Sequence, residues 1–495
     1  MSETVRNEKV DNEPILLSEA SKDEYPTGLT LWLLVGSVMM SVFLIALDQT
    51  IVGTAIPKIT DEFHGLSEVS WYGSAYFMCL GGFQSSWGKA YKFFPLKSTF
   101  LVTLFLFELG SLICGVAPNS NTLIVGRAIS GVGGAGIATG GTTIIAFCAE
   151  PKKRPTFMGL LGITYDVAAV AGPLLGGAFL DKATWRWCFY INLLIGFVVA
   201  VIIVFFFHLP SAVKVQAATW KEKVLQIDPV GIVLAMACII CFILALQYAG
   251  TTHAWRSSEV IGLLVGFALI FLAMIAWESY QGEYAMLVPR LLKQRDLWAA
   301  SPYQFFFAGS FLLLLYYLPQ YFQSVKGADP IQSGVDNLPM VIAIGILVLA
   351  GGITVTVTGR PAPFMVLGAA IATVARAAIA FPYQNCLNIA HAKVDAEDIS
   401  TVTAILYFFQ TLGGAFSISA AQSAFVNRLI TTLPLTAPGV DPLAVYVTGS
   451  TELRIVFPAE DIPGIILAYM QGIKAAFAVS IGMFGTAIVL GLILP

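Results

Sequence analysis

Repeated apolar runs of about 20 residues, each long enough to cross a bilayer as a helix, constrain this chain more than any other feature. Of its 495 residues, 57% are hydrophobic and 12% are charged, whereas soluble proteins carry about 25% charged residues. The sequence therefore predicts an all-α integral membrane protein. Thirteen spans are expected, at 29–48, 71–88, 98–117, 122–147, 156–180, 188–208, 229–249, 258–277, 298–322, 335–357, 361–381, 399–427 and 466–493.

Positive charge alternates between the segments that connect these spans. The amino-terminal tail and the loops after spans 2, 4, 6, 8 and 10 hold sixteen Lys and Arg, against five in the loops after spans 1, 3, 5, 7 and 9. Since cytoplasmic loops carry the excess of positive charge, the amino terminus is expected in the cytoplasm. The predicted units are a disordered tail (1–28), an amino-terminal half (29–208), a cytoplasmic linker (209–228), an inserted helix pair (229–277) and a carboxy-terminal half (278–495).

Among the charged residues within or at the edge of apolar spans, three are candidate site residues, because an ionisable group there is costly without a partner or an aqueous cavity. Arg127 is expected to face the bundle interior and to bond carbonyls or a carboxylate. Glu108 is a candidate partner for Arg127 or for a cationic substrate, with a purely structural ion pair as the alternative. Asp48 ends the first span, so it is interpreted either as a proton-linked carboxylate or as a helix-end charge that reaches interfacial water.

The fifth span combines small residues with a proline. Ala168, Gly172 and Gly176 recur every four residues and so form a smooth ridge that a neighbouring helix can approach closely. Pro173 removes a backbone donor beside that ridge and bends the helix. A helix that is simply well packed is the alternative interpretation.

No residue pattern supports enzyme chemistry. The glycines at 131, 133 and 136 match a dinucleotide-binding spacing, but they lie within a membrane helix without a preceding strand. The seven cysteines fall mostly in apolar spans and are interpreted as small core residues. No cofactor, metal or nucleic-acid partner is expected.

Taken together, these segments resemble the major facilitator superfamily in its fourteen-span drug:proton antiporter branch, and are similar to fungal toxin and multidrug efflux pumps. The matching antiporter signature in span 5 is Gly159, Gly172, Pro173, Gly176 and Gly177. Gly88, Lys89, Lys92 and Lys97 match the short basic form of the gating loop between spans 2 and 3. The first-span motif around Asp48, the fourth-span motif with Arg127 and Gly131, and WRWCFYIN at 185–192 also match.

The resemblance implies two six-helix halves with two inserted helices and a cavity near the membrane midplane. It implies efflux of a small amphipathic organic compound, such as a drug, toxin or secondary metabolite, against proton entry. Arg127 would tune the titration of Glu108 or Asp48. The substrate would meet an aromatic and amide surface of span 9, which could instead be ordinary core: Tyr303, Gln304, Phe305, Phe306, Tyr316, Tyr317 and Gln320. A monomer in the plasma membrane is expected, with the vacuolar membrane as the alternative.

The chain departs from the family pattern around 382–398, where relatives carry roughly 25–30 further residues, enough for one more span. The charge alternation indicates the same missing crossing. Either the gene model is defective or the protein is truly shortened, and the transcript across codons 370–400 would decide. Two other functions remain open: a siderophore or nutrient importer of the same fold, and a membrane sensor or scaffold that transports nothing.

Overall fold

The computed structural model describes most of the chain. The described residues are 26, 28–63, 69–150, 153–207, 216, 218–250, 252–328, 330–358, 387, 390–391, 394–448 and 453–493. The predicted span 361–381 lies wholly outside these residues. So do nearly all of the predicted disordered tail (1–28) and about half of the stretch 382–398.

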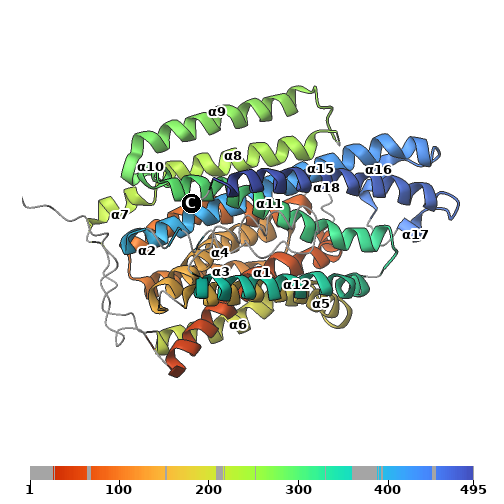
Figure 1. Ribbon diagram of the computed structural model, residues 1–495. Coiled ribbons are helices and arrows are strands. Elements are labelled where there is room, and N and C mark those ends of the chain that lie inside the picture. Colours follow the sequence, from red (N-terminus) through yellow and green to blue (C-terminus); the bar gives the residue numbers. More distant parts are fainter. Residues whose placement is uncertain are drawn as a thin grey trace, which may run out of the picture.

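The described part is helical throughout (Figure 1). Its long helices are α1 (Gly28–Phe63), α2 (Val69–Phe93), α3 (Leu96–Gly115), α4 (Ser120–Cys148), α5 (Arg154–Lys182), α6 (Trp187–Phe206), α8 (Pro229–Tyr248), α9 (Ser258–Gln281), α11 (Arg295–Ser324), α12 (Pro330–Thr358), α15 (Ile399–Thr436) and α18 (Ile462–Gly491). Short helices connect them: α7 (Trp220–Gln226), η3 (Gly282–Tyr284), α10 (Pro289–Leu292), η4 (Ala396–Asp398), α16 (Pro442–Val447) and α17 (Leu453–Val456).

Ten of the described helices are long and apolar enough to cross a membrane, which confirms the predicted all-α membrane fold but not the count of thirteen spans. Two predicted boundaries were wrong. The first span does not end at residue 48, because α1 continues to Phe63. The gating residues Gly88, Lys89 and Lys92 are not in a loop, because α2 continues to Phe93. In both places a charged residue ended the apolar run without ending the helix.

Among the first six long helices α4 is central: α2 and α3 pack closely on it, α1 and α5 also touch it, and α6 packs on α1 and α3. In its most apolar stretch 83% of the residues are buried, against 11% in α9 at the periphery. Glycines allow this enclosure: a Cβ on Gly133 of α4 would collide with the backbone of Phe107 in α3, and one on Gly131 with the backbone of Tyr76 in α2. Small residues therefore bring α2 and α3 against α4 at backbone distance.

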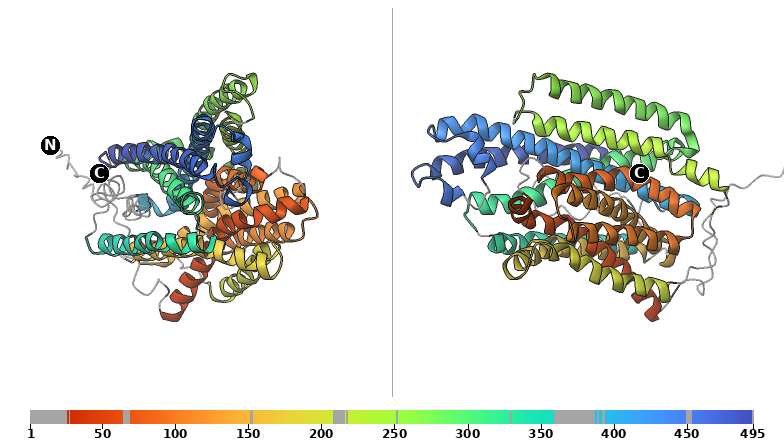
Figure 2. Two further views of the ribbon diagram at one scale, coloured as in Figure 1. Left: turned by 90° about the vertical axis from the view of Figure 1, so that its right-hand side faces the viewer. Right: turned by 180° about the vertical axis from the view of Figure 1, so that it is seen from behind.

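The helices that follow form a second group and an outlying pair. Helices α11, α15 and α18 pack on one another, while α12 lies along α5 and α15 lies along α2. Helices α8 and α9 lie side by side at the top of Figure 1 and project from the bundle in the end-on view of Figure 2. Helix α8 contacts both α2 and α15 and so spans the seam between them.

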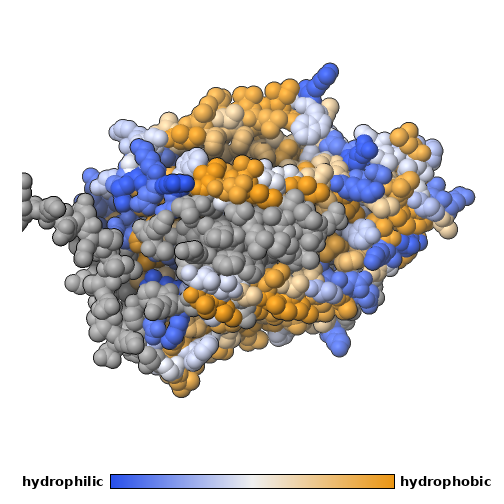
Figure 3. Space-filling view, viewed as in Figure 1, coloured by the Kyte–Doolittle hydropathy of each residue, from blue (hydrophilic) through white to orange (hydrophobic). Residues whose placement is uncertain are grey.

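The surface agrees with a membrane-spanning bundle. In Figure 3, hydrophobic residues predominate above and below the grey atoms, and hydrophilic residues gather toward the left and right ends of the visible face. Exposed large apolar side chains are frequent on α6 and α9, including Phe197, Phe205, Leu269 and Leu272. Such faces are stable in contact with lipid tails rather than with water.

The small-residue ridge of α5 packs on α1. Gly172 faces Thr50 and Gly176 faces Thr54 and Ile51, and at either glycine a Cβ would collide with the facing threonine. Thr50 Oγ1 also donates to the carbonyl of Ala168 at 3.4 Å. Pro173 lies within α5 between the two glycines. Gly177 has nothing within 4 Å of its Cβ position, and Gly159 lies in the first half of the same helix.

Gly176 on this ridge and its neighbour Gly177, which lies outside the ridge, give a matched test. Gly176→Ala should destabilise the protein by about 1–3 kcal/mol, because the new methyl group overpacks the contact with Thr54. Gly177→Ala should change stability by no more than about 1 kcal/mol, and in the stabilising direction, because alanine favours the helix. Thermal unfolding of both purified variants measures the difference, and equal melting temperatures would show that the ridge is not a tight contact.

Candidate functional site

A buried ion pair joins α1 to α4. Asp48 and Arg127 are 0% and 1% exposed, and Arg127 Nη1 lies 2.5 Å from Asp48 Oδ2. Arg127 Nε also donates to the carbonyl of Tyr72 at 2.9 Å, and the guanidinium lies 4.3 Å from the centre of the Tyr76 ring. Arg127 therefore faces the interior with both a carboxylate and a carbonyl as partners. Asp48 lies well inside α1, away from interfacial water.

Asn192 of α6 extends this cluster. Its Nδ2 donates to Asp48 Oδ1 at 3.3 Å and to Ser111 Oγ of α3 at 3.2 Å. One amide therefore ties α1, α3 and α6 together around the ion pair. Asn192 was not among the predicted site residues. It could have been predicted, because an amide within the apolar span 188–208 requires polar partners.

Glu108 of α3 lies beside the cluster but bonds neither Arg127 nor Asn192. Both of its carboxyl oxygens are buried, and neither has a hydrogen-bond partner. Its carboxyl packs against Gly196, where a Cβ would collide with it. Because Gly196 follows Asn192 by one helical turn and Ser111 follows Glu108 by nearly one turn, Glu108 lies on the faces of α3 and α6 that carry the cluster. The partner of Arg127 is Asp48.

Of the three predicted charged residues, Asp48 and Arg127 form an ion pair, whereas the Glu108 carboxyl has no hydrogen-bond partner. A buried ion pair is stable only when its remaining hydrogen-bonding groups are satisfied, and here Tyr72, Asn192 and the Tyr76 ring supply those contacts. Glu108 receives no such support from its surroundings. A proton on Glu108 would remove a charge that no group in contact balances.

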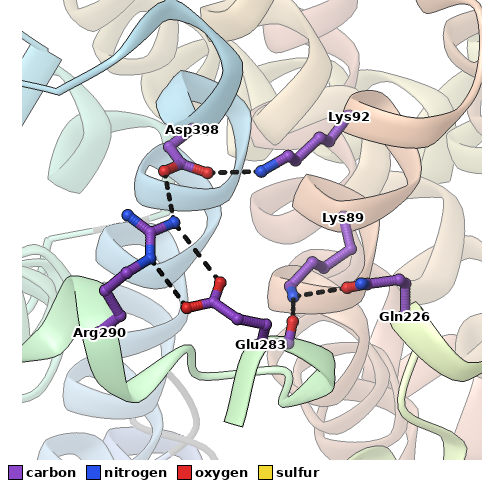
Figure 4. Close-up of polar contacts among 6 residues, drawn as sticks. All are labelled: Lys89, Lys92, Gln226, Glu283, Arg290 and Asp398. Carbon is purple, nitrogen blue, oxygen red and sulfur yellow. Dashed lines mark hydrogen bonds and ion pairs between the residues drawn. The ribbon is translucent and has the colours of Figure 1, made fainter. Parts of the chain in front are cut away.

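A second polar cluster lies at the left-hand end of the bundle in Figure 1, where α7 and α10 are found. We call it the latch, and Figure 4 shows its side chains. Lys92 Nζ of α2 pairs with Asp398 Oδ1 at 2.6 Å, and Arg290 of α10 pairs with Asp398 Oδ2 and Glu283 Oε1, each at 2.8 Å. Lys89 Nζ donates to Gln226 Oε1 of α7 at 2.8 Å and to the carbonyl of Glu283 at 2.5 Å.

The latch joins segments from both ends of the sequence. It ties α2 to η4, at the start of α15, and also to the segments before and after the α8–α9 pair. Close packing supports it, because a Cβ on Gly88 would collide with Ala404 of α15. A cavity of about 620 Å³ opens among the latch residues, lined also by Gln216, Asp395, Glu397 and Thr401. Burial alone would raise the pKa of Asp398, but the hydrogen bonds from Lys92 and Arg290 outweigh burial and lower it.

The predicted aromatic and amide surface lies on α11. Tyr303, Gln304 and Tyr317 are buried, and Tyr303 stacks on Phe307 with ring centres 5.6 Å apart. Gln304 Nε2 donates to Gln410 Oε1 and the Tyr317 hydroxyl donates to Gln422 Oε1, each at 2.8 Å. These amides belong to α15, so the polar groups of α11 and α15 bond one another.

The remaining residues of that surface are less enclosed. Phe305 is half-buried and packs edge-to-face on Phe416 with ring centres 6.1 Å apart, and the Gln320 side-chain oxygen is buried without a partner. The predicted surface lines neither the latch cavity nor the small pocket beside Trp71 and Gln247. The conformation described here therefore places these side chains in helix–helix contacts.

The Asp48–Arg127 pair makes a stability prediction. Asp48→Asn and Arg127→Met should each destabilise the protein by about 3–5 kcal/mol, because each leaves one buried charge unpaired. The double variant should be more stable than either single variant, since it contains neither charge. Melting temperatures in detergent give the comparison. Additive losses would show that the two side chains do not depend on each other.

Comparisons with known proteins identify the family of this chain. Residues 38–432 match the family model of the Major Facilitator Superfamily. The MFS-type transporter thnB of Trichoderma harzianum is 59% identical over 95% of this chain and 85% of that protein. The probable efflux pump gsfJ of Penicillium aethiopicum is 49% identical over 95% and 88%, and the Aspyridones efflux protein of Neocamarosporium betae is 40% identical over 94% and 87%.

The alignment with the T. harzianum protein has more positions than the number of residues of this chain that it includes. The alignment with the T. harzianum protein has 493 positions but covers 95% of this chain, which is about 470 of its 495 residues. About 20 positions of that relative therefore have no counterpart here, close to the length of one membrane-spanning helix.

Among solved structures, the human organic anion transporter MFSD10 matches with a TM-score of 0.56 and 14% identity, covering 94% of this chain and 100% of that chain. A bacterial homolog of the human lysosomal transporter Spinster, in an inward-facing and unoccupied conformation, matches with a TM-score of 0.51 and 14% identity, covering 95% and 98%. These likenesses show the fold alone. With the family model matched over most of the chain, this protein belongs to the Major Facilitator Superfamily of membrane transporters.

Proposed function

We propose that this transporter exports small amphipathic organic compounds, such as drugs, toxins or secondary metabolites, in exchange for protons. Export is supported by the efflux pumps among its relatives, two of which are the probable pump gsfJ and the Aspyridones efflux protein. Proton exchange is supported by the buried charges of α1, α3 and α4. The observation that carries the proposal is Glu108, a carboxyl group buried beside an ion pair and without any hydrogen-bond partner.

The coupling follows from the electrostatics of this cluster. Glu108 lies close enough to Asp48 for their charges to interact, and Arg127 is held between Asp48 and the carbonyl of Tyr72. A proton arriving on Glu108 removes its charge, and losing that proton restores a negative charge that competes with Asp48 for Arg127. Because Asp48 and Arg127 belong to different helices, this competition changes the relative stability of two arrangements of α1 and α4.

The latch supplies the second part of an alternating-access cycle. If the excess of Lys and Arg marks the cytoplasmic side, the latch closes the bundle toward the cytoplasm. Substrate would then enter from the cytoplasm when the pairs of Asp398 with Lys92 and Arg290 separate. We place the substrate against α11 and α15, where Gln304–Gln410 and Tyr317–Gln422 would exchange their mutual bonds for bonds to the substrate.

The proposed organisation is two halves with an inserted pair, α8 and α9, in the plasma membrane and as a monomer. We keep the expectation that one crossing is missing from the second half; the number of positions of a relative without a counterpart here, about 20, is close to what one crossing requires. An importer of the same fold would be recognised by uptake of a labelled siderophore or nutrient. A sensor or scaffold would move no compound in either direction.

Efflux from energised yeast cells that lack their own pumps tests the proposal, with a panel of amphipathic compounds that includes rhodamine 6G. A protonophore should abolish export by the wild type. Arg127→Ala and Glu108→Gln should reduce export at least about tenfold, equivalent to about 1.4 kcal/mol of coupling free energy. Glu259→Gln, an exposed acid on α9, is the matched control and should export normally. Undiminished, protonophore-resistant export by the wild type and by both variants would contradict proton coupling.

A further inference from the structure

Two acids meet at the base of the α8–α9 pair, far along the sequence from the Glu108 cluster. Asp228 is the residue that caps the amino terminus of α8, and Glu278 lies in the last turn of α9. Their exposed fractions are 1% and 6%. The function proposed above uses neither residue, and the inference drawn from them does not depend on that function.

Asp228 is held as an acceptor by three donors. The Gly231 amide and Trp277 Nε1 each donate to Oδ1 at 2.9 Å, and the Met286 amide donates to Oδ2 at 3.0 Å. The backbone at Asp228 has a positive φ of 52°, a conformation that aspartate tolerates better than most residues. Three donors satisfy the charged form of a carboxylate, so Asp228 is built to remain an anion.

Glu278 is only half satisfied. The Leu287 amide donates to its Oε2 at 2.8 Å, while its Oε1 is buried without a partner. A Cβ on Gly231 would lie 2.9 Å from Glu278 Oε1 and closer still to Asp228 Oδ2. These two oxygens are therefore less than about 6 Å apart, close enough for the charges of the two carboxylates to interact. Gly231 leaves the space in which the two acids meet.

The positive charge nearest this pair is already engaged. Among the described residues, the charged groups that act on Glu278 are Asp228 of α8 and Lys89 of α2. Lys89 Nζ donates to Gln226 and to the carbonyl of Glu283, and around it lie Lys92, Glu283 and Asp398 of the latch. Two buried carboxylates at this separation cannot both remain charged without a cation or a proton between them.

We propose that Asp228 and Glu278 form a proton-binding site in which one proton, carried on Glu278 Oε1, is shared with Asp228. The bound proton supplies the donor that Glu278 Oε1 lacks and leaves Asp228 as the anion that its three donors require. It also leaves Lys89 free to bond Gln226 and Glu283. The site therefore links proton occupancy to the attachment of the α8–α9 pair to α2, which Ser86 completes by donating to the carbonyl of Ile227 at 2.8 Å.

Loss of the proton would place a second negative charge beside Lys89. The ammonium group would then turn toward the two carboxylates and away from Gln226 and the Glu283 carbonyl. Helix α7, which carries Gln226, would lose one of its attachments to α2. The α8–α9 pair would thereby respond to pH without any contact with substrate.

Infrared spectroscopy of the purified full-length protein in lipid nanodiscs, titrated from about pH 5 to about pH 9, tests the site directly, because a protonated carboxyl has a C=O band that a carboxylate lacks. Other buried acids contribute bands, so the comparison is the difference between wild type and Glu278→Gln. That substitution should remove one carboxylic-acid band. Glu259→Gln, which replaces an exposed acid on the same helix, is the control. Over the pH range in which the Glu278 band is present, it should remove no carboxylic-acid band. If wild type and Glu278→Gln have the same bands at every pH, the site does not exist.

Hydrogen exchange of α7 tests the consequence. After correction for the intrinsic effect of pH on exchange, α7 of the wild type should exchange faster above the pH at which the Glu278 band is lost. Glu278→Gln, which mimics the protonated acid, should not show this increase. Equal pH responses in the two proteins would overturn the link to α2. Neither measurement involves transport, so failure here is separate from failure of the proposed efflux.

Discussion

A guanidinium group buried among membrane helices is the constraint on which the described site depends. An arginine cannot be neutralised at ordinary pH, so the fold must provide it with an anion and with acceptors. Here Asp48 provides the anion, Tyr72 the carbonyl and Tyr76 the aromatic face. Helices α1, α2 and α4 are thereby fixed around one charge. Asn192 adds α3 and α6, so five helices converge on the pair.

Close packing makes this convergence possible. Charged groups inside a membrane interact strongly when water is kept away from them, and large side chains would hold the helices apart. Glycines in α4 and α5 remove that obstacle at the contacts with α2, α3 and α1. At the latch, Gly88 serves the same purpose between α2 and α15. The protein thus combines tight, apolar helix contacts with a small number of polar clusters that can exchange partners.

The fold and the buried positions of the candidate charges were predictable from the sequence, because burying a charge in a membrane is costly and marks a residue that needs partners. Arg127 and Glu108 were identified by their positions inside apolar spans, and the fold by the spans themselves. The choice of partner was not predictable. Asp48 and Glu108 were equally acceptable by chemistry, and only the packing of α1 against α4 selects Asp48. Asp48 was also misplaced, because hydropathy ends a span at a charge whereas the α1 backbone continues to be hydrogen-bonded as a helix.

Neutral polar residues, and charged residues whose partners are distant in the sequence, are harder to predict from sequence than single buried charges. Asn192 carries no charge, so the cost of burying an ionisable group does not mark it. Asp228 and Glu278 lie at opposite ends of the α8–α9 helix pair in the sequence, and neither was among the predicted site residues. Their proximity depends on the turn geometry at Asp228 and on the absence of a side chain at Gly231. Sequence spacing contains neither piece of information.

Proton binding within the Glu108 cluster can be tested without a known substrate. Proteoliposomes adsorbed on a solid-supported membrane and exposed to a rapid pH jump produce a transient current when protons bind inside the membrane. The wild type should produce such a current, and Glu108→Gln should reduce it to what the Asp228–Glu278 site contributes, with the protein folded and inserted equally in both. A current of undiminished size in the Glu108→Gln protein would show that protons bind elsewhere and would contradict proton binding at Glu108.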